Sequence, residues 1–243
     1  MKTSFLVIKG VNGTIGDTIP LFEQDERLAS LPSLSNYLDP KTAKFTPAFS
    51  GVDRASDDPY LTAASSNAVT ETAINSKKAF SLAAWKRMTS TSAVLKKTST
   101  LAFVMQRAAA EITQANFMNL PFENGRLQFI PMLSCRVGYA GTAYSMPSAS
   151  APQANQAVVV MLAFNESENK VKRICGSYTD EIVDASTKFG AFKDEVLLIG
   201  TNGASPEIKV GEIFIFDKDL FLSENEFERE DVLDYLRTNY AAN

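Results

Sequence analysis

The stretch GEIFIFDKDLFLSENEFEREDVLDYLRTNY, residues 211–240, decides the fold because it holds the clearest strand and the clearest helix of the chain. Ile213 and Ile215 alternate with the phenylalanines that follow each of them, so both faces of this strand are apolar. A strand with one solvated face would carry polar residues on it. The pattern therefore predicts a central strand that is covered on both sides.

A helix signal follows the turn at residues 217–222. Ser223, with Glu226 three residues later, forms the capping-box pattern, and the glutamates around them place negative charge on the positive end of a helix dipole. An apolar stripe at helical spacing comprises Val232, Leu233, Tyr235, Leu236 and Tyr240. We therefore predict a helix that starts after Ser223 and docks on a sandwich, with a structural role.

Short apolar strands separated by turn residues account for much of the remaining chain. The predicted strands are Ser4–Val11, Ala79–Trp85, Leu101–Gln106, Arg126–Leu133, Ala157–Phe164, Lys170–Ile174 and Val196–Gly200. Regular short strands without intervening helices favour an all-β sandwich or barrel over a βαβ sheet. One other segment, Ala108–Asn119, is predicted to be helical.

The N-terminal part has a different composition. Asn12-Gly13 predicts a tight hairpin after the first strand. Prolines at positions 20, 32, 40, 47 and 59, among many Ser and Asp residues, disfavour long regular elements. We expect residues 1–60 to form a loop-rich N-terminal arm, as an attachment region, and residues 61–243 to form the main domain.

Composition narrows the classes of function. The 243 residues carry a net charge of −4, which gives no basic footprint for nucleic acid, and they include no histidine, which removes histidine-based catalysis and histidine-ligated zinc. No apolar run approaches the roughly 20 residues of a membrane span, and no secretory signal is evident, so we expect synthesis in a host cytoplasm. Cys135 and Cys175 are isolated in sequence; buried thiols are favoured over a disulfide between them.

The C-terminal pattern also resembles that of a known family. The residues that carry the resemblance are Glu212, Ile213, Ile215, Phe216, Asp217, Leu222, Glu226, Val232, Tyr235, Leu236, Asn239 and Tyr240, with the strand end Leu198-Ile199-Gly200 before them. This arrangement resembles the concanavalin A-like lectin/glucanase and laminin-G-like jelly-roll modules, of the kind found in bacteriophage virion proteins. The resemblance covers about residues 100–243 and implies an antiparallel jelly-roll β-sandwich with a C-terminal helix.

The same resemblance raises enzymatic and metal-dependent functions. Hydrolases of this fold carry an E-x-D-x-x-E strand, and no segment here matches it, so we expect no enzyme activity and no catalytic residues. Lectins of the fold cluster oxygen ligands around calcium, and Asp53, Asp57 and Asp58 could form such a loop. We expect no obligatory cofactor and keep calcium as the alternative.

Three functions remain after these exclusions. The first is a non-enzymatic virion structural protein, in a tail, fibre or capsid-decoration component, that binds other virion proteins and itself as a homo-oligomer. The second is a carbohydrate-binding module that recognises a host surface glycan, for which Tyr139, Tyr144 and Tyr178 can offer stacking platforms, although packing is the commoner role of tyrosine. The third is a divergent polysaccharide-degrading enzyme. A virion location is expected from the first.

Overall fold

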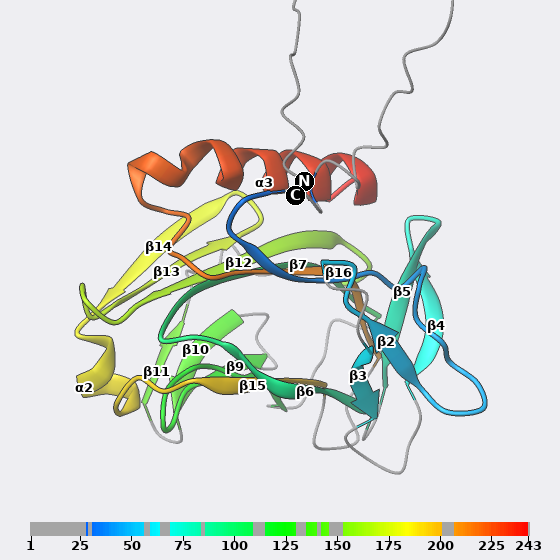
Figure 1. Cartoon of the computed structure of the whole chain (residues 1–243), viewed down its shortest axis with the longest axis horizontal. Coiled ribbons are helices and arrows are strands. Elements are labelled where there is room, and N and C mark those ends of the chain that lie inside the picture. Colours follow the sequence, from blue (N-terminus) through cyan, green and yellow to red (C-terminus); the bar gives the residue numbers. More distant parts are fainter. Residues whose placement is uncertain are drawn as a thin grey trace, which may run out of the picture.

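The computed structural model consists of two antiparallel sheets stacked face to face, with one long helix on the outside of one sheet (Figure 1). The residues that it describes are 28, 31–55, 59–63, 69–83, 86–108, 115–129, 135–139, 142–145, 153–200 and 207–242. This architecture confirms the predicted all-β, antiparallel sandwich with a C-terminal helix.

We call the helix-covered sheet sheet A. Its strand order is β14-β13-β12-β7-β16-β5-β4, and β1 also pairs with β16. The bounds are β14 Tyr178–Val183, β13 Lys170–Cys175, β12 Ala157–Asn165, β7 Thr98–Arg107, β16 Ile208–Phe216, β5 Lys77–Leu82, β4 Thr70–Ile74 and β1 Leu34–Leu38. The long β12 and β7 pair along their whole length, in keeping with their near-continuous apolar sequences.

The second sheet, sheet B, has the order β11-β10-β9-β8-β15-β6-β3-β2. Its strands are β11 Thr142–Ser145, β10 Cys135–Tyr139, β9 Arg126–Phe129, β8 Ala115–Asn119, β15 Glu195–Gly200, β6 Arg87–Leu95, β3 Pro59–Ala63 and β2 Ser50–Val52. The short helix α2, Ala185–Phe189, leads from sheet A back toward sheet B. Among the described elements, no helix crosses the outer face of sheet B (Figure 1).

Strand β16 is buried on both faces, as its sequence predicts. Ile213 and Ile215 belong to the core between the sheets, whereas Phe214 and Phe216 belong to a second core beneath the helix. All four side chains are fully buried. Along its edges β16 pairs with β7 on one side and with β5 and then β1 on the other, so it is a central strand.

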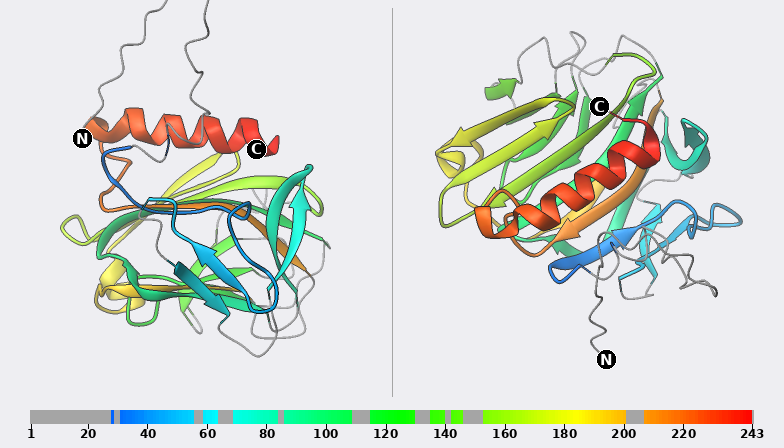
Figure 2. Two further views of the ribbon diagram at one scale, coloured as in Figure 1. Left: turned by 45° about the vertical axis from the view of Figure 1, so that its right-hand side comes forward. Right: turned by 90° about the horizontal axis from the view of Figure 1, so that it is seen from above.

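Helix α3, Glu226–Tyr240, lies across the outer face of sheet A, as the view from above shows (Figure 2). It contacts β7 and β12. The predicted stripe of Val232, Leu233, Tyr235, Leu236 and Tyr240 is buried in the second core. The stripe and the docking of this helix are thereby confirmed.

The predicted start of that helix is wrong. Ser223 opens a 3₁₀ turn, η2 Ser223–Asn225, and the α-helix begins only at Glu226 after Asn225 as N-cap. Neither cap position makes a side-chain capping hydrogen bond, so the Ser223–Glu226 capping box does not form. The chain is held in this turn by tertiary contacts, which override the local signal.

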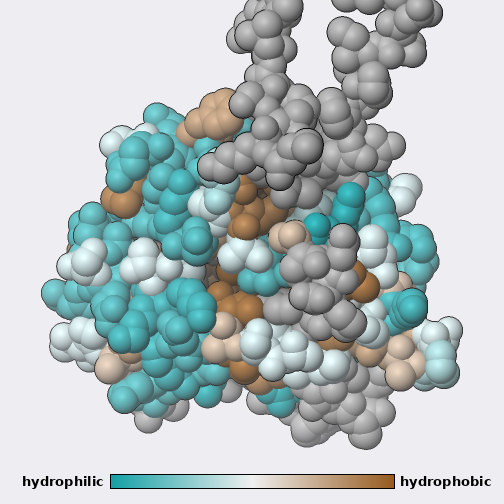
Figure 3. All heavy atoms as spheres, in the orientation of Figure 1, coloured by the Kyte–Doolittle hydropathy of each residue, from teal (hydrophilic) through white to brown (hydrophobic). Residues whose placement is uncertain are grey.

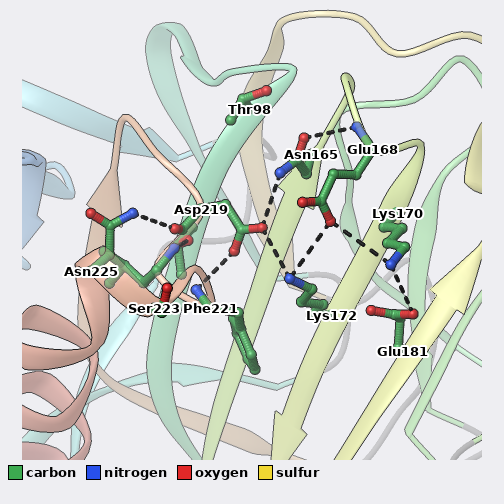
Figure 4. A network of polar contacts seen from close by, with 12 residues as sticks. Thr98, Asn165, Glu168, Lys170, Lys172, Glu181, Asp219, Phe221, Ser223 and Asn225 are labelled. Atoms are coloured by element: carbon green, nitrogen blue, oxygen red, sulfur yellow. Dashed lines mark hydrogen bonds and ion pairs between the residues drawn. The ribbon is translucent and has the colours of Figure 1, made fainter.

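These contacts converge on Asp219, which is buried in the turn before the helix (Figure 4). Its carboxylate accepts hydrogen bonds from Asn165 Nδ2 at 3.1 Å and from the Phe221 N–H at 2.8 Å, and Lys172 Nζ lies 3.5 Å away. Asn225 Nδ2 donates to the Asp219 carbonyl at 2.7 Å. The helix start is therefore fixed to β12 and β13 by side chains rather than by its own cap.

The other end of the helix closes on a bulge in β16, and we call these contacts the C-terminal clasp. The register between β16 and β7 shifts between Val210 and Ile213, and the Glu212 N–H donates to the Tyr240 hydroxyl oxygen at 3.1 Å. A Cβ on Gly211 would lie 2.7 Å from Cζ of Tyr240, so only glycine admits the ring this close.

The Glu212 carboxylate is the centre of the clasp. Its Oε1 accepts hydrogen bonds from the Tyr37 hydroxyl at 2.6 Å and the Tyr235 hydroxyl at 2.8 Å, and its Oε2 accepts one from Asn239 Nδ2 at 3.0 Å. Burial raises the pKa of Glu212, and the hydrogen bonds from the two tyrosines offset part of that rise. Residues quoted for the family resemblance thus form one contact network.

Two further predictions need correction or restriction. Ala115–Asn119 is strand β8, so the predicted helix over Ala108–Asn119 is wrong in that part; there the chain pairs with β9 and β15. Within residues 1–60, the described strands β1 and β2 pair into sheets A and B, so these two segments belong to the sandwich. The hairpin at Asn12-Gly13 and Trp85 lie outside the described residues, and the attachment role of residues 1–60 stays a prediction.

The predicted thiol is confirmed for Cys175, which is buried at the end of β13 and forms no disulfide. Cys135 lies on β10 of the opposite sheet.

Candidate functional site

The molecular face seen in Figure 3 is mainly hydrophilic, with hydrophobic residues gathered chiefly beneath the helix. No described helix is long and apolar enough to cross a bilayer. A pocket of about 160 Å³ lies on sheet B, and its lining residues are Arg87, Phe117, Met118, Asn119, Arg126, Leu198 and Gly200.

Strand register explains how residues so far apart in sequence meet there. Leu197 and Ile199 point into the core, so the alternate positions Leu198 and Gly200 of β15 face outward. Gly200 pairs with Arg87 on the neighbouring strand β6. On the other side, Ile199 pairs with Met118 of β8, which brings Asn119 next to Leu198 on the outer face.

The pairing of β8 with β9 brings the second arginine, Arg126, to the pocket. Asn119 of β8 pairs with Arg126 of β9, directly after the turn that joins them. Gly125 closes that turn: its carbonyl accepts hydrogen bonds from the Leu120 N–H at 3.1 Å and from Arg126 Nη1 at 2.8 Å. The turn therefore orients the Arg126 guanidinium as well as connecting the strands.

Gly200 makes the hollow between the two arginines. Its φ of +134° lies in a region that side chains rarely allow, and an added Cβ would lie 2.3 Å from the Lys86 carbonyl oxygen and 2.7 Å from Arg87 Cα. Any other residue would both strain the backbone and fill the space beside Arg87. This is the glycine of the Leu198-Ile199-Gly200 strand end quoted for the resemblance.

The two guanidinium groups form a positive site. Burial, and then the positive charge of Arg126, lower the pKa of Arg87. Among the described residues, no carboxylate forms an ion pair with either arginine, whereas many exposed lysines have such partners. Two like charges placed together without a counter-ion favour an anion between them.

Asn119 adds a specific polar group. Its side chain is only 8% exposed, and its Oδ1 atom has no hydrogen-bond partner in the described part of the chain. A buried acceptor without a partner loses the free energy of hydration, so native proteins usually satisfy it with protein, water or ligand. The pocket therefore combines donors for an anion with an acceptor for a hydroxyl or N–H group.

Two of the three tyrosines predicted to bind glycan share one hairpin of sheet B, and the third lies on sheet A. Tyr139 and Tyr144 lie on the hairpin β10–β11, at register positions opposite Thr142 and Val137, and their side chains are outside the description. Tyr178 is half-buried on β14, at the edge of sheet A. All three are in strands rather than the predicted loops, and their binding role stays a prediction.

The predicted calcium ligands are only partly described. The Asp53 carboxylate accepts hydrogen bonds from Asn36 Nδ2 at 2.7 Å and from the Tyr37 and Ala55 N–H groups at 2.8 and 3.0 Å, so it holds the chain around β1. Asp57 and Asp58 lie outside the described residues. Within the described ranges no group of three or more acidic, histidine or cysteine residues could hold a metal. Calcium binding stays a prediction.

Sequence reasoning missed the pocket residues Arg87, Asn119 and Arg126. The available signals were local and weak: an arginine directly after the turn glycine Gly125, and a glycine ending a strongly apolar strand at Gly200. Neither signal shows which other residues lie beside it in the folded protein, because the pocket forms only when four strands pair in this register.

No family model matches the chain, and no curated protein matches it significantly. Among solved structures it is similar to the receptor-binding domain of botulinum neurotoxin D, with a TM-score of 0.59 and 13% identity over 84% of this chain and 54% of that chain. A structure of the botulinum neurotoxin serotype D ligand-binding domain with N-acetylneuraminic acid matches with a TM-score of 0.57 and 14% identity, over 84% and 52%.

The binding domain of botulinum neurotoxin DC in complex with SialylT matches with a TM-score of 0.56 and 11% identity, over 84% of this chain and 52% of that one. The chain thus spans about half the length of these neighbours. At such identities the likeness shows the fold alone. The protein is therefore a β-sandwich of the kind found in these receptor-binding domains, which are binding domains rather than catalytic ones.

Proposed function

We propose that this protein is a non-enzymatic recognition module that binds a glycan at the pocket on the outer face of sheet B. The observation that carries the proposal is the pocket itself, with two arginines that lack described ion-pair partners and a buried, unsatisfied Asn119 beside the apolar side chain of Leu198. Pockets that combine apolar walls with a few placed polar groups are the usual form of small-molecule sites.

The fold neighbours support this proposal without locating the site. Two of those domains were solved in complex with N-acetylneuraminic acid and with SialylT. Because this chain matches about half of each neighbour, the place of binding is argued from its own residues. The pocket is smaller than the roughly 300–1,000 Å³ of drug-sized sites, which suits one terminal unit of a larger ligand.

The second candidate function is a structural role in a virion. With it we propose that the protein comes from a bacteriophage and has a concanavalin A-like fold. The same two arginines favour the structural role, since they would also suit an acidic segment of a neighbouring subunit. This role requires subunits to assemble through the pocket face. Sedimentation at increasing protein concentration measures that assembly, and a chain that stays monomeric throughout would argue against it.

The glycan proposal is tested by filling the pocket without changing its charge. Leu198→Trp places an indole in the hollow, and Val196→Trp places the same group on the same face of the same strand outside the pocket lining. On a glycan array, wild type and Val196→Trp should bind the same glycans and Leu198→Trp should lose them. Equal binding by all three proteins would show that the glycan site lies elsewhere, for example at Tyr139, Tyr144 or Tyr178. Failure of wild type to bind any glycan would refute the proposal.

A further inference from the structure

The charge arrangement of the pocket narrows the kind of ligand. Arg87 on β6 and Arg126 on β9 both line the pocket, together with Gly200 of β15. Arginine presents planar, paired N–H donors that match the two oxygens of a carboxylate. The pKa of Arg87 is lowered mainly by burial, and the positive charge of the nearby Arg126 is the second cause.

Asn119 makes a carboxylate-bearing sugar a better ligand for the pocket than a simple inorganic anion. Its buried Oδ1 needs a hydrogen-bond donor, and it lies opposite Arg126 in the β8–β9 register, so the donor must sit next to the anionic group. Sulfate offers only acceptors near neutral pH, and inorganic phosphate carries one or two O–H groups, which lie on the anion itself. An acidic sugar carries hydroxyl or amide N–H groups elsewhere on the molecule that bears the carboxylate.

The walls of the pocket fit the rest of such a ligand. The half-buried Leu198 supplies apolar surface beside the polar groups, whereas Phe117 and Met118 are buried in the core, and a sugar ring presents C–H groups to a surface such as that of Leu198. Inorganic anions gain nothing from such a wall. The volume of about 160 Å³ limits the bound part to one unit.

We propose that the pocket takes the carboxylate of an acidic sugar, held by Arg87 and Arg126, with Asn119 Oδ1 accepting a hydrogen bond from a hydroxyl or amide N–H of the same sugar. This inference rests on the proposed glycan-binding function and specifies its ligand class. It makes Arg87 and Arg126 the carboxylate-binding residues and Asn119 the residue that selects a sugar over other anions.

Titration calorimetry with four probes tests the assignment: N-acetylneuraminic acid, its methyl ester, N-acetylglucosamine and inorganic phosphate. Only the first should bind well, and its affinity should fall as salt is raised. Arg87→Gln and Arg126→Gln should each weaken binding about 10- to 100-fold, the loss expected for a hydrogen bond to a charged group. Arg237→Gln removes the same charge from α3, on the other side of the sandwich, and should leave binding unchanged.

Asn119→Ala distinguishes sugar recognition from anion capture. It should weaken binding of N-acetylneuraminic acid while leaving any weak phosphate binding as in wild type, and circular dichroism would verify that each variant is folded. Equal binding of the acid and its methyl ester, or of phosphate and the sugar, would overturn the inference. Binding of neutral glycans alone would overturn it while leaving the proposed function intact, and no binding of any glycan would remove both.

Discussion

Replacing Tyr240 with Phe removes a single oxygen from the C-terminal clasp. The hydroxyl accepts the Glu212 N–H at 3.1 Å, at a bulge where β16 does not follow the ladder of β7, and both residues are buried. The ring would still pack on Gly211, so no cavity forms. The hydroxyl also donates to the Lys78 carbonyl at 3.5 Å, so the substitution removes the bond from Glu212 and this longer one.

The expected cost follows from leaving that donor without an acceptor. A buried, unsatisfied N–H costs roughly 1–3 kcal/mol, so the free energy of unfolding should fall by about that amount. In a chain of this size each kcal/mol lowers the melting temperature by about 2–4 °C, which gives a decrease of roughly 2–12 °C.

Urea unfolding followed by circular dichroism measures the change. Tyr178→Phe on β14 is the matched control, because no hydrogen bond to its hydroxyl is found among the described residues, and it should stay within about 0.5 kcal/mol of wild type. The slope of the transition should be the same in all three proteins. If Tyr240→Phe unfolds at the same urea concentration as wild type, the Tyr240 hydroxyl is not the acceptor that closes the bulge.

Three more perturbations test other parts of the structure. Burial raises the pKa of Glu212, so the folded state binds this proton more tightly than the unfolded state, and the group costs stability as pH rises above about 4.3; Glu212→Gln should therefore gain stability relative to wild type as pH rises from about 4.3 through the folded-state pKa of Glu212, and a difference that stays constant from acidic to neutral pH would contradict the assignment. Gly200→Ala should lower the melting temperature and abolish ligand binding because its Cβ meets the Lys86 carbonyl; unchanged stability would show that the backbone there is not held as described. Leu236→Ala should cost about 2–5 kcal/mol in urea unfolding, whereas the exposed Asp234→Ala should cost less than about 0.5 kcal/mol; equal values would mean that α3 does not dock through its stripe.

The parts of the fold that could be predicted are those with dense local patterns. The alternation in β16 predicted burial on both faces because each side chain's face follows from the two-residue period of a strand. The stripe of α3 was equally readable from its helical period.

Other parts depended on contacts that no local pattern encodes. The capping box at Ser223 did not form because Asp219 holds that turn through contacts with Asn165 of β12 and Lys172 of β13, and Asn225 donates to the Asp219 carbonyl within the turn. Residues 115–119 became a strand because two neighbouring strands were available to pair with it. The N-terminal prolines suggested loops, yet short strands fit between them.

The pocket shows the same limit for function. Arg87 and Arg126 are separated by 39 positions in sequence (126 minus 87), and Leu198 comes 72 positions later (198 minus 126), yet all line one hollow. Sequence reasoning turned to tyrosines because aromatic residues are recognisable without a structure. Strand register, together with the missing side chain of Gly200, determines instead which charged groups meet.

The most direct test of a sugar site on sheet B is backbone amide NMR during titration with N-acetylneuraminic acid. The account predicts that shifts concentrate on residues 87, 117–119, 126 and 198–200, with the amides of α3 unaffected. Shifts centred on β10–β11, on β14 or on α3, or none at saturating sugar, would contradict it.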